Sequence, residues 1–212
     1  MKKGFRFASL VSTLLVLSLL ITTAASAFTL YGKKLIGGVK DRTYWVDNPT
    51  YIFKDSDGTY KAINYGTYID IAVQNWNNSV NNENKFERTT DVYFTKAKDR
   101  ASATVIFTVA EYGNTGWDGK TFFFKDGVNV AGQSEAPTKD YDKVTIGINV
   151  SLTYKTEDHY KVSLAGHEFG HALGLDHFSG GPPYSLMNKY VSNAPFGPTA
   201  DDVTGVQKIY SK

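Results

Sequence analysis

The stretch His167-Glu168-Phe169-Gly170-His171-Ala172-Leu173-Gly174-Leu175-Asp176-His177 indicates both a fold and a metal site. In a helix, residues four apart differ by about 40° around the axis, so His167 and His171 point the same way. Two neutral imidazoles on one rigid face supply half of a tetrahedral zinc site. Gly174 can adopt the left-handed conformation that ends a helix, which would return His177 to the same metal. The stretch therefore predicts three zinc ligands, His167, His171 and His177.

Glu168 is offset from the two helical histidines by one residue, near enough to reach a metal-bound water but not aligned as a ligand. Three neutral ligands leave the full charge on zinc, which lowers the pKa of the water towards about 7. Glu168 would act as general base while hydroxide attacks a peptide carbonyl, and would then protonate the leaving amine. Zinc is favoured over copper because three imidazoles and an open position suit hydrolysis.

The alternative is that these histidines are ordinary solvated or hydrogen-bonded helix residues. In that case, three of the chain's four His would occur at the spacing of a metal site without binding a metal. The pattern instead gives each fixed residue a geometric task, which favours the metal site.

Composition narrows the remaining classes. With 212 residues, 42% hydrophobic and 14% aromatic, the chain fits one globular domain and not a disordered polymer. The absence of Cys excludes disulfides, thiolate zinc sites, iron–sulfur ligation by Cys and a Cys nucleophile. A net charge of +2 is too small for a nucleic-acid partner, so none is expected.

The first 27 residues have the pattern of a secretory signal peptide. Residues 1–7 carry three basic and no acidic side chains, 8–21 form an apolar run, and the segment ends in Ala25-Ser26-Ala27. The run is shorter than the roughly 20 residues of a spanning helix, so an uncleaved membrane anchor is the weaker alternative. Cleavage after Ala27 leaves 20 basic and 21 acidic side chains, a net charge of −1. We expect a secreted protein without a stable membrane anchor.

Apolar periodicity predicts three helices, over 67–80, about 159–173 and 200–210, with Thr67 and Thr199 as candidate N-caps. β-Branched and aromatic runs predict strands over 43–46, 50–53, 103–109, 121–124, 128–131 and 144–150. Asp55-Ser56-Asp57-Gly58 resembles the start of a calcium loop, but the later loop positions do not match, which favours a plain Asp-Gly turn. The order of elements indicates an α+β fold.

The histidine stretch resembles the metzincins, and its surroundings are similar to their matrixin branch. Ser185-Leu186-Met187 follows the last histidine as that family's Met-turn does, and 201–210 resembles its C-terminal helix with paired Asp. The segment 69–76 and the following Phe86 resemble its first helix and the exit from it. The likeness runs roughly from Arg42 to Tyr210 and is strongest after His159.

The resemblance implies a zincin-like domain with a twisted, mostly parallel five-stranded sheet, an antiparallel edge strand, two long helices and a small C-terminal subdomain with one helix. The chain would divide into a signal peptide (1–27), a short N-terminal segment (28–41) and a catalytic domain (42–212) whose lower subdomain is 175–212.

The resemblance also assigns supporting residues. Met187 would be the hydrophobic base beneath the ligands, although a single Met is also common as core filler. Asp201 and Asp202 would brace the Met-turn and the last helix; alternatively, they are acids favoured by the helix dipole. Gly174 would be the structural turn.

For substrate, Val130, Ala131 and Gly132 resemble the sheet edge that binds an extended peptide antiparallel. The stretch 188–197, with Asn188 and Tyr190, would form the outer wall of the pocket that holds the substrate residue following the scissile bond. Tyr190 as a hydrogen-bond donor in the transition state competes with its being a surface or wall tyrosine.

Departures from the family matter equally. Only His159 remains outside the motif, so a second, structural zinc is not expected, and Ca²⁺ is possible but unsupported. Without Cys there is no Cys-switch latency. We expect a monomeric zinc metalloendopeptidase with one catalytic Zn²⁺, acting on proteins or peptides. The alternatives are a secreted zinc-binding adhesive protein without protease activity and a zinc amidase acting on cell-wall peptides.

Overall fold

The computed structural model describes residues 28–80, 90–132, 135–178, 185–190 and 195–211. The predicted signal peptide therefore lies outside the described residues. Among the helices within these ranges, none is both long enough and apolar enough to cross a membrane.

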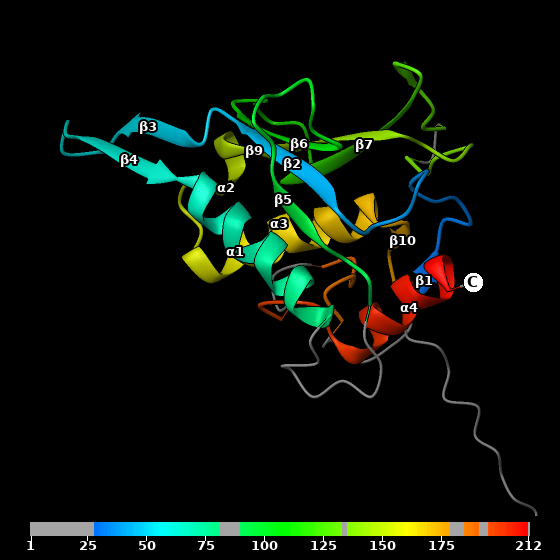
Figure 1. The fold of residues 1–212 in the computed structure, drawn as a ribbon. Coiled ribbons are helices and arrows are strands. Elements are labelled where there is room, and N and C mark those ends of the chain that lie inside the picture. Colours follow the sequence, from blue (N-terminus) through cyan, green and yellow to red (C-terminus); the bar gives the residue numbers. More distant parts are fainter. Residues whose placement is uncertain (1–27, 81–89, 133–134, 179–184, 191–194, 212) are drawn as a thin grey trace, which may run out of the picture.

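A six-stranded sheet forms the centre of the domain (Figure 1). Its order is β5 (Phe94–Lys96), β2 (Arg42–Asp47), β6 (Val105–Ala110), β9 (Lys143–Asn149), β7 (Gly119–Lys125) and β8 (Val128–Asn129). The first four strands are parallel, whereas β7 pairs antiparallel with β9 and β8 antiparallel with β7.

The sheet differs from the predicted one at both edges. It has six strands and not five. The antiparallel strand β7 is not the last strand on its side, because the two-residue strand β8 pairs with its C-terminal end. Asp126 and Gly127 both have positive φ, 52° and 77°, which is the conformation of a tight hairpin turn that sends the chain back along β7. At the other edge, β5 is three residues long with one buried side chain, too short for a periodic pattern.

Two helices, α1 (Tyr65–Asn77) and α3 (Asp158–Ala172), cover the same side of the sheet (Figure 1). The Trp76 indole N–H of α1 donates to the Gly166 carbonyl of α3 at 3.0 Å, and both are buried. Phe169 of α3 packs edge-on against Phe94 and stacks with Phe107 of the sheet. Each such fully buried side chain stabilises the fold by about 1.5–3 kcal/mol. The core therefore fixes α3 against the strands.

The first helix begins two residues earlier than predicted. Asn64 and not Thr67 is the N-cap, because the Asn64 side chain accepts a hydrogen bond from the Thr67 N–H at 3.3 Å. The helix ends at Asn77, and a 3₁₀ turn, Asn78–Val80, follows. A short helix, α2 (Val150–Thr153), leads from β9 towards α3.

A hairpin of β3 (Thr50–Lys54) and β4 (Tyr60–Asn64) projects away from the domain (Figure 1). Its turn matches the Asp-Gly interpretation, since the Asp55 N–H donates to the Thr59 carbonyl at 2.8 Å and Gly58 has a φ of 85°. The Asp55 carboxylate is ion-paired with Lys61 across the hairpin.

The N-terminal segment and the lower subdomain pack together. β1 (Thr29–Leu30) pairs antiparallel with β10 (Leu175–Asp176). The last helix, α4 (Ala200–Tyr210), begins at the predicted cap Thr199, which forms a capping box with Asp202. The Tyr210 hydroxyl accepts a hydrogen bond from the Leu35 N–H at 3.0 Å. Residues 28–41 are thus part of the same fold.

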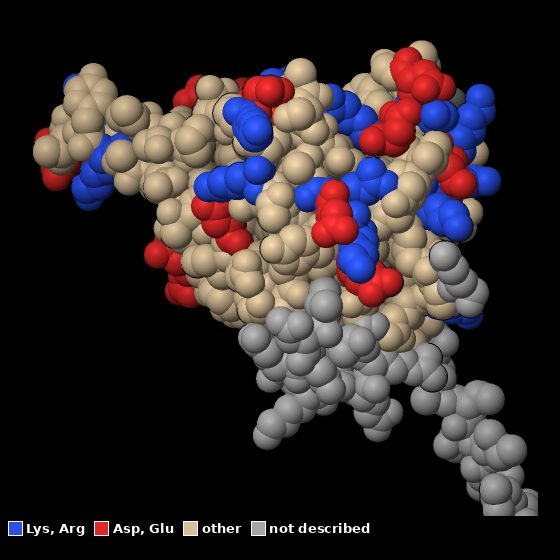
Figure 2. Space-filling view, viewed as in Figure 1, with Lys and Arg blue, Asp and Glu red and all other residues tan. Residues whose placement is uncertain are grey.

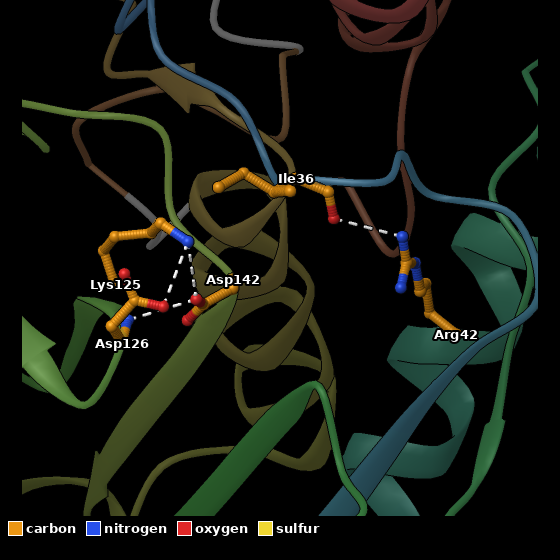
Figure 3. A network of polar contacts seen from close by, with 5 residues as sticks. All are labelled: Ile36, Arg42, Lys125, Asp126 and Asp142. Carbon is orange, nitrogen blue, oxygen red and sulfur yellow. Dashed lines mark hydrogen bonds and ion pairs between the residues drawn. The ribbon is translucent and has the colours of Figure 1, made fainter.

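Figure 3 shows polar contacts at two places, before β2 and at the β7–β8 turn. The Arg42 guanidinium donates to the carbonyl of Ile36 at 3.0 Å and so secures the approach to β2. At the β7–β8 turn, the Lys125 ammonium lies 3.2 Å from the Asp126 carboxylate and 3.1 Å from that of Asp142. On the face seen in Figure 2, basic and acidic side chains are interspersed and do not form one field of a single sign.

Candidate metal centre and active site

Helix α3 presents His167 and His171 on one face, and the chain turns sharply after it. Gly174 has a φ of +100°, and its N–H donates to the His171 carbonyl at 2.9 Å. A Cβ at this position would lie 2.9 Å from the Lys33 carbonyl oxygen, so both the backbone conformation and the space require glycine. The turn carries His177 back towards the helical histidines.

The three histidines converge through their Nε2 atoms. Nε2 of His177 lies 3.1 Å from Nε2 of His167 and 3.2 Å from Nε2 of His171. In a tetrahedral zinc site with Zn–N distances of about 2.0–2.1 Å, two ligand nitrogens are about 3.3 Å apart. The spacing therefore fits one zinc ion, held by these three residues.

Hydrogen bonds on the opposite ring nitrogens set the tautomers. Nδ1 of His167 lies 2.7 Å from the Leu186 carbonyl oxygen, and Nδ1 of His171 lies 2.8 Å from that of Leu175. Because a carbonyl only accepts, both Nδ1 atoms carry the proton and both Nε2 atoms present lone pairs to the metal position.

Burial keeps the three imidazoles neutral. It lowers the pKa of His167 to about 4, and it lowers those of His171 and His177 as well, with the neighbouring histidines adding to the effect on the two helical residues. Only the neutral imidazole binds a metal, so the protein environment favours the ligand form around neutral pH.

Met187 packs against helix α3 at Gly170. It is fully buried, and a Cβ at Gly170, between the two helical histidines, would overlap its sulfur. The turn that carries Met187 is joined to the third ligand's loop, because the Phe178 N–H donates to the Met187 carbonyl at 2.9 Å.

Asp202 is the centre of a buried hydrogen-bond network that holds this turn. Its carboxylate accepts from the Ser185 hydroxyl at 2.7 Å, the Leu186 N–H at 3.0 Å and the Thr199 N–H at 2.8 Å. Burial raises its pKa, and these hydrogen bonds partly offset the rise. Asp201 is only half-buried in the first turn of α4. The sequence predicts the same bracing role for both acids, but in the structure the network is centred on Asp202.

Glu168 lies buried between α3 and β7. Its Oε2 lies 2.7 Å from the Thr121 hydroxyl oxygen, and the same hydroxyl lies 3.0 Å from the Glu168 carbonyl oxygen. A Cβ at Gly119 would lie 2.8 Å from Oε1, so the carboxylate occupies the space that a side chain there would fill. Burial raises the pKa of Glu168 to about 7.

A cleft of about 440 Å³ contains this centre. It is lined by the three histidines and Glu168 together with Tyr31, Gly116, Trp117, Asp118, Gly119, Lys120, Thr121, Glu135, Tyr160, Leu164, Asp176, Lys189 and Tyr190. The arrangement combines a metal position, a carboxylate of near-neutral pKa and room for a substrate, which suits hydrolysis.

The family comparison agrees with the geometry. The family model described as Matrixin matches residues 44–211. The chain is a matrixin. Matrixins depend on zinc, and the three-histidine cluster fits that requirement.

Solved structures show a likeness of fold. A chain of the GM1-bound form of the ECX AB5 holotoxin aligns with this matrixin at 15% identity and a TM-score of 0.50, covering 85% of this chain and 90% of that one. The crystal structure of myroilysin aligns at 12% identity and a TM-score of 0.43, covering 89% and 96%. A comparison with curated proteins gives no significant match.

The strand beside the cleft of this matrixin is β7 and not the predicted stretch Val130–Gly132. The Asn149 N–H donates to the Asp118 carbonyl, so alternate residues of β7 bond to β9 and the main-chain groups of Gly119 and Thr121 are directed away from it. In the described part of the chain, β8 pairs only with the far end of β7.

The predicted substrate residues are therefore placed unequally. Val130, Ala131 and Gly132 follow β8 and do not line the cleft, whereas Tyr190 does, with 73% of its surface exposed. Asn188 is half-buried, and its side chain accepts a hydrogen bond from the Tyr190 N–H at 3.0 Å. Residues 191–194 of the predicted outer wall lie outside the described residues.

Sequence reasoning missed Tyr31, Gly119 and Thr121. The Tyr31 hydroxyl lies 2.9 Å from Nδ1 of His171, and its ring is 5.6 Å from the His171 ring. None of the three belongs to a motif, and each reaches the site from a distant segment. One available signal was Gly119, because a glycine within a strand often marks a place where another group approaches the backbone closely.

Proposed function

We propose that this matrixin is a secreted zinc-dependent endopeptidase that uses Glu168 as its general base. The observation that carries the proposal is the convergence of three histidine Nε2 atoms within a cleft that also contains the buried carboxylate. On its side away from β9, the Gly119–Thr121 part of β7 pairs with no strand among the described residues, and it borders the same cleft. A purely structural zinc site has no use for such a base or for such an edge.

The zinc ion would be held by His167, His171 and His177, and when bound it would supply Lewis-acid polarisation and acidify a water molecule. Glu168 would accept a proton from the attacking water and transfer it to the leaving amine. Burial disfavours the charged carboxylate and so raises the proton affinity of Glu168, which suits a group that must take up a proton.

The substrate would be an extended peptide that pairs antiparallel with β7. Gly119 and Thr121 direct main-chain groups away from β9 on the cleft side, and such groups bind any peptide backbone. Because Gly119 and Thr121 also contact Glu168, the paired peptide would pass close to the base.

The test is the replacement of Glu168 by Ala. We expect purified wild-type protein to cleave casein or members of a peptide library, and Glu168→Ala to bind one zinc while its cleavage falls to a small residual level. Glu111→Gln is the matched control, since Glu111 is an exposed glutamate that does not line the cleft. It should retain cleavage.

The same assays separate the alternatives. A wild-type protein that binds zinc stoichiometrically and cleaves no protein or peptide would be a binding protein, and the proposal would fail. Digestion of peptidoglycan in place of proteins would identify an amidase. Secretion is tested separately: the N-terminus of protein recovered from the medium should be Phe28.

A further inference from the structure

The contact between Thr121 and Glu168 joins strand β7 to helix α3 at the proposed base. Both side chains are buried, Thr121 with 6% and Glu168 with 5% of its surface exposed. One hydroxyl touches two oxygens of the same residue, the carboxylate Oε2 at 2.7 Å and the main-chain carbonyl at 3.0 Å. Because the Thr121 hydroxyl contacts both the carboxylate and the main-chain carbonyl of Glu168, it restricts the side-chain torsions of Glu168.

We propose that Thr121 is the positioning residue for Glu168, holding its carboxylate in the conformation that faces the cleft. The inference rests on the proposed function of Glu168 as general base. Thr121 acts through Glu168 and does not itself need to touch the reacting atoms.

The position of Thr121 suits this role because its own conformation is fixed. It lies in the middle of β7, opposite Ile146 of β9, and a β-branched side chain in a strand has restricted χ1. Its hydroxyl therefore cannot turn freely away from Glu168. A flexible surface residue could make the same hydrogen bond without defining the carboxylate position.

Gly119 completes the arrangement from the same face of the strand. It is two residues from Thr121, and a Cβ there would lie 2.7 Å from Cγ and 2.8 Å from Oε1 of Glu168. Glu168 is thus bounded by a hydroxyl on one side and by a space that only glycine leaves open on the other. Two adjacent same-face positions of one strand define where the carboxylate lies.

A competing explanation is that the hydroxyl only satisfies the buried carbonyl of Glu168. This role would affect stability, but it would be independent of the Glu168 side chain. The two explanations predict different behaviour when the carboxylate is absent, so they can be separated by a double-mutant cycle.

The experiment compares Thr121→Val, which keeps the branched shape without the hydroxyl, with Thr121→Ser, which keeps the hydroxyl. We expect kcat of Thr121→Val to fall on the order of 10- to 100-fold, with KM and zinc content unchanged and activity restored in Thr121→Ser. In a Glu168→Ala background, Thr121→Val should cause no further loss of residual activity. Unchanged kcat in Thr121→Val, or full additivity with Glu168→Ala, would overturn the proposal.

A second measurement is independent of catalysis. The chain has six Glu, so the carboxyl carbon signal of Glu168 can be followed by NMR in glutamate-labelled protein and assigned with Glu168→Gln. The signal should move in Thr121→Val and return in Thr121→Ser; an unmoved signal contradicts the proposal. If wild type cleaves no peptide, the proposed function fails while this measurement still reports on the contact. If Thr121→Val does not fold, the smaller Thr121→Ala replaces it in both tests.

Discussion

The buried carboxylate of Asp202 lies 2.7 Å from the Ser185 hydroxyl, so the last helix directly holds the turn that carries Met187. The contact links helix α4 to the turn whose Met187 packs against the metal-binding helix α3. It also gives the two adjacent acids of α4 different expected importance.

Replacing Asp202 by Ala should lower the free energy of unfolding by about 3 kcal/mol, because it leaves several buried donors without an acceptor. Asp201→Ala is the matched control one residue away and should change stability by about 0.5 kcal/mol or less. Urea denaturation of both variants measures the difference. Equal losses in the two variants would contradict a special role for Asp202.

Stability of the metal-free protein should depend on pH through Glu168. Burial raises the folded pKa of Glu168 from 4.5 to about 7, so the folded state keeps a proton that the unfolded state has already lost. Stability contributed by the protonated group is present below pH 4.5 and is lost as pH rises to about 7, a change of about 3 kcal/mol.

Glu168→Gln removes this titration. With a chelator present, its stability relative to wild type should increase between pH 4.5 and 7 and then stay level, as measured by urea denaturation at a series of pH values. A constant difference for Glu168→Gln would show that the carboxyl group is not buried as described.

Adding a methyl group at Gly119 should displace the base. Gly119→Ala places a Cβ within 2.9 Å of three Glu168 side-chain atoms, so kcat should fall on the order of 100-fold while zinc remains bound. Gly147→Ala on the neighbouring strand is the control, because the three atoms nearest to its Cβ would all belong to the Tyr112 side chain, at 3.3 Å or more. Steady-state kinetics with metal analysis tests both; a fully active Gly119→Ala would refute the close packing.

The Tyr31 hydroxyl should strengthen zinc binding through His171. Tyr31→Phe should raise the zinc Kd by about tenfold, the lower end for outer contacts to a ligand, because the Leu175 carbonyl still holds the same Nδ1. Tyr210→Phe is the control, since its hydroxyl anchors Leu35 of the same segment away from the ligands. Competition with a chromogenic chelator gives both constants. Equal weakening would point to the segment as a whole.

The parts of the site that were predictable from sequence are those set by neighbours along the chain. Helix α4 begins at Thr199 because its cap and Asp202 are three residues apart, and the histidines share a face because they are four apart. Thr121 meets Glu168 across 47 residues, and Tyr31 meets His171 across 140, so local spacing carried no information about either contact.

The substrate edge shows a different limit. The stretch from Val128 to Gly132 has strand-forming residues, which made it a reasonable edge, but pairing depends on register. The turn at Asp126 and Gly127 limits β8 to the end of β7, and this leaves Gly119 and Thr121 beside the cleft. The two-residue turn sets which residues of β7 pair with β8, and a hydrophobic pattern does not contain this information.

The packing of residues 28–41 against β10 and the last helix has a consequence for synthesis. Leu35 bonds to Tyr210 across 175 residues, and β10, which ends just before the third histidine, pairs with β1. A nascent chain still lacking its last helix has neither the Asp202 network nor this closure, and contacts of such long sequence separation form late in folding. The metal centre should therefore be completed only after helix α4 has been made and has packed against the N-terminal segment.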